Sequence, residues 1–189
     1  MSTKIFEVGS MACEDIQSYV ISAKFKASNV FAEVHDGAIV KLGGLCADPV
    51  YDGLKDWNCY ECTAPANASD AFVIVDLDEV SEGTIAGNSY KIGNKLVDLK
   101  CKPGYAARCR RLVKGDKFWL GEGNFVSAPT VGEYGKITAS STLITAASTV
   151  SGANFAILAS KPMTIGTSVA HTGTGESLAY EQEYLVEVL

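Results

Sequence analysis

The sequence predicts an all-β fold, a single antiparallel β-sandwich or barrel domain with a short N-terminal arm. The first observation is alternation: from Tyr19 to Ala27 every second residue is apolar, which is the period of a half-buried strand. The second is that most of the 18 glycines stand at turn-forming positions between short apolar runs. The third is the slight evidence for helices. Many short strands at this spacing are typical of sandwiches and barrels.

The expected elements follow one another in chain order. Strands are predicted at 18–27, 38–42, 71–77, 95–99, 107–113, 117–120, 154–159 and 183–189. The turns between them are marked by Asp36-Gly37, Gly43-Gly44, Asp52-Gly53, Glu82-Gly83, Pro103-Gly104 and Gly121-Glu122-Gly123. Residues 1–16 are predicted to form the arm, or a short helix capped by Ser10, and 17–189 the single β-rich domain.

The composition is that of an ordinary globular protein, with 47% hydrophobic and 20% charged residues. Its 16 basic and 22 acidic residues give a formal charge of −6, which argues against general binding to nucleic acids or to anionic membranes. The first residues lack the apolar stretch of a secretory signal, and no window is long enough for a membrane helix. We therefore expect a protein that does not use the Sec pathway and whose six cysteines are mostly thiols.

All the arginines of the chain lie close together, at Arg108, Arg110 and Arg111. If 107–113 is a strand, Arg108 and Arg110 point to one face, while Cys109 and Arg111 point to the other. Such a strand has no fully apolar side. We therefore predict an edge strand or a solvent-facing position for this segment.

Arginine suits sites where a planar guanidinium group meets carboxylates in a fixed geometry. Two interpretations remain open: pairing with acidic residues of the same chain, which contributes little at a surface, or docking onto an acidic partner. Nucleic-acid binding is a weaker third interpretation, because few aromatic residues interleave with the basic ones. On the docking hypothesis the partner-binding residues are Arg108, Arg110, Arg111, Lys114 and Lys117.

The segment from Ile137 to Ser160 contains no charged residue. Core strands and loops of small residues explain part of this composition. A protein–protein interface, whose centre is depleted of charge, would explain the remainder. Together with the arginine cluster, this segment favours an assembly component over an enzyme.

Four of the cysteines, Cys59, Cys62, Cys101 and Cys109, could bind zinc, because four thiolates give a tetrahedral site. The spacing between Cys101 and Cys109 does not match a zinc ribbon or finger, and Cys109 falls at an alternating position of an expected strand. A thioredoxin-type role for Cys59 and Cys62 lacks the surrounding βαβ pattern. Buried thiols are therefore the preferred interpretation, and no metal or other cofactor is expected.

The remaining candidates for chemistry are two histidines and a small acidic cluster. His35 and His171 belong to no recognisable nucleophile motif, so both are expected to be exposed loop residues. Asp76, Asp78 and Glu79 follow an expected strand. They could form a weak divalent-cation site or a solvated strand end, and we prefer the second interpretation. No catalytic residue is predicted.

The run "RRLVKGDKFWLGEGNFVSAPTVGEYGKIT" at 110–138 and the ending "EQEYLVEVL" resemble small β-rich virion proteins of tailed double-stranded DNA bacteriophages. The likeness is to the head-decoration, cement or head-fibre type. The matching features are a strand that opens on "GDKF", the turn region "APTVGEYG", late strands rich in Thr, Ser and Ala, and a short terminal strand.

This resemblance implies a non-enzymatic structural protein, made in the bacterial host cytoplasm and bound to the capsid surface of the virion. Such proteins often associate as homo-trimers, and their partner is the major capsid protein. They carry no cofactor and no catalytic residues, and they need neither nucleic acid nor membrane as a partner. The six cysteines depart from the pattern, which leaves a metal-stabilised or host-adapted variant open.

Other classes of protein compete with a capsid decoration protein. A tail-tube or head–tail adaptor component is the nearest alternative, because ring-forming tail proteins are also β-sandwich-like. A host-surface or glycan-binding module would use Trp57, Tyr60, Trp119 and Tyr134 for stacking, although such aromatic residues belong more often to the core. A metal-dependent or redox enzyme would need the four candidate cysteines to converge in space.

Overall fold

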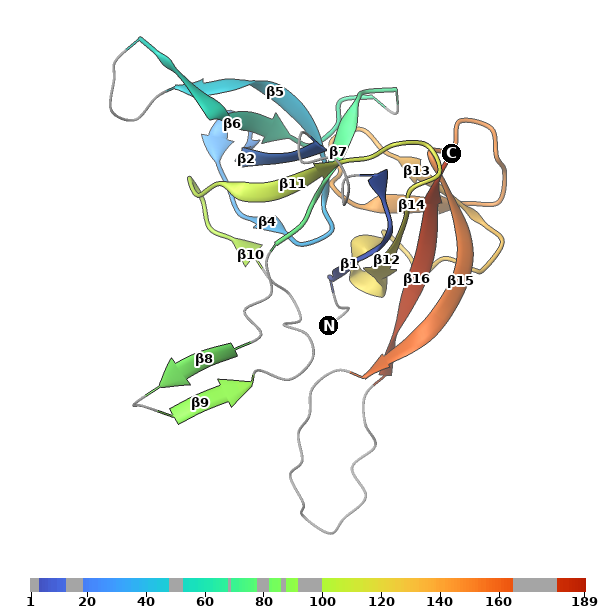
Figure 1. The fold of residues 1–189 in the computed structure, drawn as a ribbon. Coiled ribbons are helices and arrows are strands. Elements are labelled where there is room, and N and C mark those ends of the chain that lie inside the picture. The colour runs from blue at the N-terminus through green and yellow to red at the C-terminus, as the bar shows by residue number, and fades with distance from the viewer. Residues whose placement is uncertain are drawn as a thin grey trace.

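The computed structural model describes residues 4–12, 19–47, 53–67, 69–77, 82–85, 88–91, 100–164 and 180–189. These residues form an all-β structure, as predicted, with no α-helix among them and a 3-10 turn, η3 (Glu122–Asn124). The strands build two six-stranded sheets and two small two-stranded ones. Figure 1 shows the two large sheets packed beside each other.

The first large sheet, which we call sheet A, contains both ends of the chain. Its strands lie in the order β1 (Phe6–Ser10), β12 (Lys117–Gly121), β16 (Tyr180–Val188), β15 (Phe155–Thr164), β13 (Tyr134–Ile137) and β14 (Ile144–Ala147). All neighbouring strands in this order are antiparallel. The outer strands of sheet A are therefore β1 and β14.

The second large sheet closes on itself and forms a barrel. Its ring contains β2 (Val20–Ala27), β11 (Ala107–Arg111), β7 (Phe72–Val75), β5 (Ile39–Ala47) and β6 (Lys55–Thr63), after which β6 returns to β2. The strand directions in a closed ring can alternate throughout only if the number of strands is even. With five strands, one pair must be parallel, and this pair is β2 with β6. The predicted antiparallel pairing thus has one exception in the barrel wall.

Smaller elements extend the barrel. The strand β3 (Val30–Phe31) forms a hairpin with the end of β2. The strands β4 (Val34–His35) and β10 (Lys100–Cys101) pair with each other, as do β8 (Glu82–Ile85) and β9 (Asn88–Lys91). The predicted strand at 95–99 lies outside the described residues.

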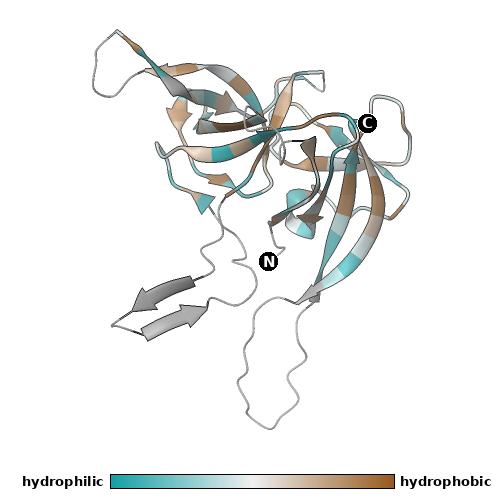
Figure 2. Cartoon of the chain, viewed as in Figure 1, coloured by the Kyte–Doolittle hydropathy of each residue, from teal (hydrophilic) through white to brown (hydrophobic). Residues whose placement is uncertain are grey.

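The apolar run of β7 shows how the barrel packs on sheet A. Ile74 is fully buried in the cluster that contains the sheet A residues Phe118 and Phe155. Its neighbours Val73 and Val75 belong instead to the cluster inside the barrel. Because successive side chains of a strand point to opposite faces, a strand with cores on both sides is apolar at every position. Figure 2 shows the contrast with β15 and β16 of sheet A, each of which carries both apolar and polar stretches.

The N-terminal residues form a strand within sheet A. Of the expected arm or helix at 1–16, Phe6–Ser10 form β1, which pairs with β12 so that Phe6 lies opposite Leu120. Both side chains are buried in the core between the layers. Residues 13–16 lie outside the described residues.

Candidate functional site

The arginine-containing segment is a central strand of the barrel. The predicted alternation is confirmed along β11, because Ala107 and Cys109 are buried in the barrel while Arg108 and Arg110 are less buried. The predicted edge position is wrong, since β11 pairs with β2 on one side and with β7 on the other. The strand can be central because its inward-facing residues in the ladder are small enough to fit a narrow barrel.

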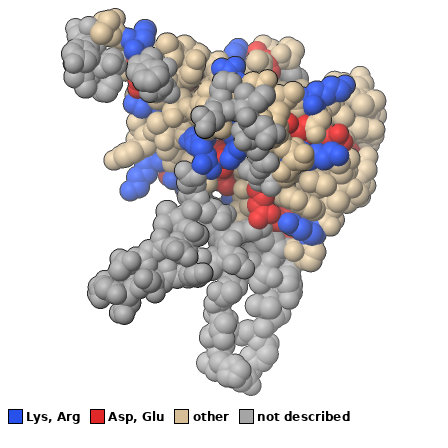
Figure 3. Space-filling model, viewed as in Figure 1, with Lys and Arg blue, Asp and Glu red and all other residues tan. Residues whose placement is uncertain are grey.

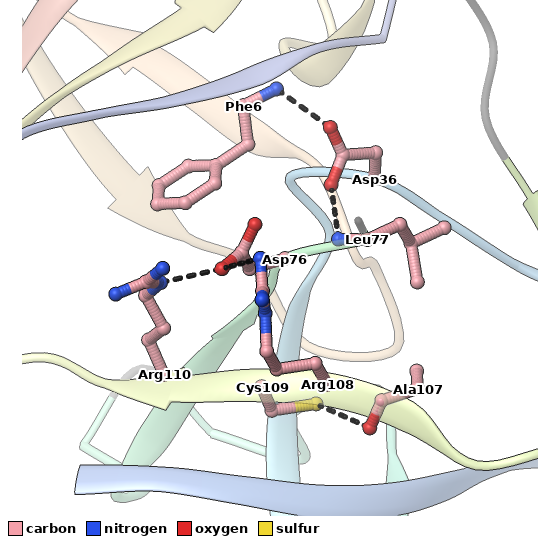
Figure 4. A network of polar contacts seen from close by, with 8 residues as sticks. All are labelled: Phe6, Asp36, Asp76, Leu77, Ala107, Arg108, Cys109 and Arg110. Carbon is pink, nitrogen blue, oxygen red and sulfur yellow. Dashed lines mark hydrogen bonds and ion pairs between the residues drawn. The ribbon is translucent and has the colours of Figure 1, made fainter. Parts of the chain in front are cut away.

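One carboxylate engages two of the arginines. The Oδ2 atom of Asp76 lies 2.8 Å from Nη2 of Arg108 and 2.5 Å from Nε of Arg110. Figure 4 shows the two guanidinium groups on either side of Asp76. Intrachain pairing, the first of the two interpretations of the cluster, is therefore realised for Arg108 and Arg110. Of the acidic cluster, Asp76 faces these arginines, whereas Asp78 and Glu79 lie outside the described residues.

The other basic residues of the predicted partner-binding set face solvent. Arg111 and Lys114 are exposed, and Lys117 is half-buried on β12, opposite Glu187 of β16. On the face drawn in Figure 3, Lys and Arg form small separate groups, several of them beside acidic residues. The positive charge of this set is therefore spread over separate positions, and Arg111 and Lys114 are the two most accessible residues among them.

The uncharged segment contributes to both core and surface. Its buried side chains, Ile137, Ile144, Phe155 and Ile157, are at most 5% exposed and pack between the two layers. Core strands thus explain part of the composition, as expected. The remainder of the segment forms the outer strand of sheet A, the turns that flank it and the first part of β15.

The outer strand β14 has unusual chemistry for a sheet edge. Natural edge strands are commonly protected by charged residues or proline, but Thr145, Ala146 and Ala147 are uncharged and partly exposed. At one end of the strand, the amide of Val126 donates a hydrogen bond to the carbonyl of Ile144, at 2.9 Å. The Val126 side chain is 58% exposed beside this contact. An uncharged edge next to an exposed valine is suited to contact with another protein.

The four candidate zinc ligands do not converge. Cys59 and Cys62 are three positions apart on β6, so they point to opposite faces of the strand. Cys62 and Cys109 lie inside the barrel, and Cys101 packs against that cluster from β10. Cys59 instead meets Cys46 of β5, with 3.5 Å between the two sulfur atoms. Within the described ranges, no three or more His, Cys, Asp or Glu residues form a group that could hold a metal ion.

Of the two histidines, the structure describes His35. His35 belongs to β4 and is half-buried, so its expected place in an exposed loop is wrong. Its pairing with a strand 65 positions away, at Lys100, could not be read from local sequence. His171 lies outside the described residues.

The proposed stacking residues come from both layers. Trp57 and Tyr60 belong to β6, Trp119 to β12 and Tyr134 to β13. Tyr60 packs against the core of the barrel. The ring of Trp119 lies under the ammonium group of Lys161, with 4.2 Å between the nitrogen and the ring centre. Tyr60 and Trp119 therefore do not belong to one aromatic platform.

Lys161 also joins two acidic residues on the outer face of sheet A. Its Nζ atom lies 3.1 Å from Oε2 of Glu183 and 3.3 Å from Oε2 of Glu7. Glu183 is fully buried, although its side chain points away from the core between the layers. Burial is the largest single influence on the pKa of Lys161 and lowers it, but the contacts with the two carboxylates together outweigh burial and raise the pKa. The cluster ties β1 and β16 to β15, and no local pattern in the sequence indicates it.

A second buried carboxylate fixes the N-terminal strand. Asp36 accepts hydrogen bonds from the backbone amides of Phe6 and Leu77, each at 2.9 Å (Figure 4). Asn124 adds two further bonds, accepting from the amide of Ile5 and donating to the carbonyl of Asp36. Burial raises the pKa of Asp36 to about 7, although the hydrogen bonds from both amides favour the charged form. A residue expected only to mark a turn therefore connects β1 to the barrel.

A cavity of about 510 Å³ opens where the barrel meets sheet A. The turn between β2 and β3, the loop after β6 and the loop between β13 and β14 surround it. The amide of Ser140 donates a hydrogen bond to the carbonyl of Pro65, at 2.8 Å, which ties two of these loops together. The lining is mixed, because Lys26, Asn29, Thr63, Thr142 and two serines lie beside apolar residues such as Phe25 and Pro65. The volume is that of a small-molecule site.

The same cavity collects unusual backbone conformations. Ser28, Asn29 and Ser140 have φ angles of 50°, 65° and 60°. They are the non-glycine residues with positive φ in the described part of the chain, and all three line the cavity. Left-handed non-glycine residues are costly and tend to cluster where function requires a fixed geometry. The cavity is thus the second candidate site after the β14 edge.

Comparison with known proteins identified no relatives. No family model matches the chain, and neither a curated protein nor a solved structure shows significant similarity to it. Among the described residues, no helix has the length and hydrophobicity needed to span a bilayer.

Proposed function

We propose that this chain is a non-enzymatic structural protein of a tailed-phage virion. In this role it is made in the bacterial cytoplasm, binds the major capsid protein on the assembled head, and stabilises the shell. The observation that supports binding to another protein is the uncharged edge strand β14 of sheet A. The likeness of the run 110–138 and the chain ending to decoration proteins supplies the identity of the partner.

The β14 edge supports this role because an extended segment of a partner can pair with it. The backbone groups at a sheet edge form hydrogen bonds with an added strand, and the side chains beside it provide specificity. Two valines close to this strand, Val126 and Val150, are 58% and 59% exposed and offer apolar surface. The amide of Val126 is hydrogen-bonded to Ile144 of β14, and Val150 follows β14 closely in sequence. Burial of such side chains contributes about 1.5–3 kcal/mol each.

The exposed basic residues would set the orientation of the bound protein. We propose that Arg111, Lys114 and Lys117 contact acidic groups of the capsid. Complementary charge at such a contact fixes the register of the two proteins more than it adds to their affinity. Arg108 and Arg110 are already engaged by Asp76 and serve chiefly to hold the barrel.

Oligomerisation would strengthen attachment to a lattice. Several weak contacts on one particle add through multivalency, so a homo-trimer would bind far more tightly than a monomer. A native mass spectrum of the purified protein tests this part of the proposal. A trimer supports it, whereas a ring-sized mass would favour a tail-tube or head–tail adaptor component.

Binding to heads provides the test of the function itself. The substitution Ala147→Lys places a charge on the edge strand, on the face of β14 opposite to the one that carries the buried Ile144. Ala106→Lys makes the same chemical change at an exposed barrel position. We expect Ala147→Lys to lower the fraction that sediments with heads of the encoding phage by about tenfold, or about 1.4 kcal/mol. Ala106→Lys should bind as the wild type does, and equal binding by both variants would refute the role of the edge.

The cavity favours a second candidate function, the binding of a neutral polar ligand such as a saccharide. Its hydroxyl and amide groups can exchange hydrogen bonds with a sugar, and its volume is sufficient for one or two rings. Titration with neutral mono- and disaccharides, followed by NMR, should perturb the amides of Asn29, Thr63 and Thr142. Perturbations confined to other residues, or none at all, would remove this candidate.

A further inference from the structure

The closest approach between two described cysteines lies on the wall of the barrel. Cys46 of β5 and Cys59 of β6 have their sulfur atoms 3.5 Å apart, and each residue is 3% exposed. The two strands are antiparallel, and Leu45 pairs with Tyr60 before the register shifts to Ala47 and Lys55. The two thiols therefore meet beside a shift in the ladder, and a sulfur–sulfur distance of 3.5 Å can close to that of a disulfide after small adjustments.

We propose that Cys46 and Cys59 form a disulfide bond when the protein is transferred from a reducing to an oxidising environment. A bond needs a sulfur–sulfur distance of about 2.05 Å, so the thiols must approach by about 1.5 Å. Side-chain rotation supplies a movement of this size. The register of β5 also shifts between Leu45 and Ala47, which gives the backbone around Cys46 a local irregularity rather than a uniform ladder.

The chemistry requires an external disulfide, such as oxidised glutathione. One thiol loses its proton and attacks the glutathione disulfide, which forms a mixed disulfide and releases one glutathione thiolate. The second protein thiol then loses its proton and displaces the second glutathione. The protein loses two hydrogens in total, and one oxidised glutathione becomes two reduced molecules.

The surroundings of the pair predict a slow reaction. Burial is the main cause that raises the pKa of Cys59 to about 12, and the neighbouring Cys46 raises it further. The attacking thiolate is therefore scarce at neutral pH, so exchange depends on transient opening of the barrel wall. The reduced form should persist during synthesis, and the oxidised form should accumulate over hours outside the cell.

The other described cysteines lack a comparable partner. Cys62 and Cys109 belong to the barrel interior. The Cys101 thiol instead lies 3.5 Å from the carbonyl of Tyr105. The cross-link would join β5 to β6 beside the hairpin that connects them, and would stabilise a wall of the barrel. This inference is independent of the proposed function.

Disulfide mapping by mass spectrometry tests the inference. The purified full chain is held in oxidised glutathione for increasing times, its free thiols are alkylated, and it is then digested. We expect one intramolecular link, between Cys46 and Cys59, and a higher melting temperature in the linked protein. Cys46→Ser and Cys59→Ser should each abolish both changes, whereas Cys62→Ser should retain them.

Two results would overturn the inference. The first is complete alkylation of both Cys46 and Cys59 after long oxidation under mildly destabilising conditions that leave the circular dichroism spectrum native. The second is a different pairing, for example one that contains Cys62. Because all variants are read by both mapping and spectroscopy, a variant that fails to fold is recognised and does not count as a loss of the link.

Discussion

Arg110 holds Asp76 through a contact of 2.5 Å between Nε and Oδ2, with both side chains largely buried. Arg108 approaches the same oxygen to within 2.8 Å. A segment whose composition left intrachain pairing and docking onto a partner both open therefore provides an internal ion pair at the barrel wall. The basic residues close to one another in sequence divide into structural residues and surface residues.

Arg110→Met should destabilise the protein by roughly 3 kcal/mol, because it removes one partner of a buried carboxylate. The loss is at the lower end of the range for such changes, since Arg108 remains beside Asp76. Arg111→Met is the matched control and should change stability by less than about 0.5 kcal/mol, because Arg111 is exposed. Urea denaturation of the two variants makes the comparison. Equal losses of stability would contradict the structural role of Arg110.

Asp36→Asn should flatten the dependence of stability on pH. The folded-state pKa of Asp36 is raised to about 7 from 3.8, so between these values the folded state binds more protons than the unfolded state. Its contribution therefore falls as pH rises, by up to about 1.4 kcal/mol per pH unit. Denaturation at several pH values between about 4 and 7 should show a wild-type-minus-variant difference that decreases with pH. A constant or increasing difference would refute this assignment.

Gly9→Ala should loosen the N-terminal strand. A Cβ atom at this position would lie 2.4 Å from the backbone carbonyl oxygen of Lys117, so β1 would have to move away from β12. Gly44 provides the control, because a Cβ there meets nothing within 4 Å. We expect a loss of about 1–3 kcal/mol and faster amide exchange in β1 for Gly9→Ala alone. Similar behaviour of the two variants would contradict the close packing of β1.

Lys161→Met should destabilise sheet A by roughly 1–3 kcal/mol, because it removes one charged partner of the buried Glu183. Lys114→Met, at an exposed position, should have little effect. Thermal unfolding of both variants measures the difference. If Lys161→Met unfolds at the same temperature as the wild type, the stability of the fold around Glu183 does not depend on this lysine.

Local sequence was sufficient for the fold class but not for the pairing of its elements. The alternation from Tyr19 onward predicts β2, and the apolar run before Asp76 predicts β7. The edge position predicted for 107–113 was wrong because Asp76, which neutralises Arg108 and Arg110, is more than thirty positions away in sequence. No local pattern can report such a partner.

The same limitation applies to the buried polar residues and the cysteines. In the sequence, Asp36 is indistinguishable from an ordinary turn residue. Its role depends on the backbone amide of Phe6, 30 positions earlier, which only the folded chain brings to it. The CxxC motif drew attention to Cys59 and Cys62, but the partner of Cys59 is Cys46 on the adjacent strand. The cavity is equally invisible in the sequence, because three separate loops surround it.

Amide hydrogen exchange at Ala146, whose N–H group faces away from β13, measured with and without assembled phage heads, tests the central proposal most directly. If β14 is the docking edge, exchange at Ala146 should slow in the presence of heads, while exchange in the exposed barrel loop around Ala106 should be unchanged. Bound protein whose Ala146 amide exchanges as fast as that of the free protein would contradict the proposal.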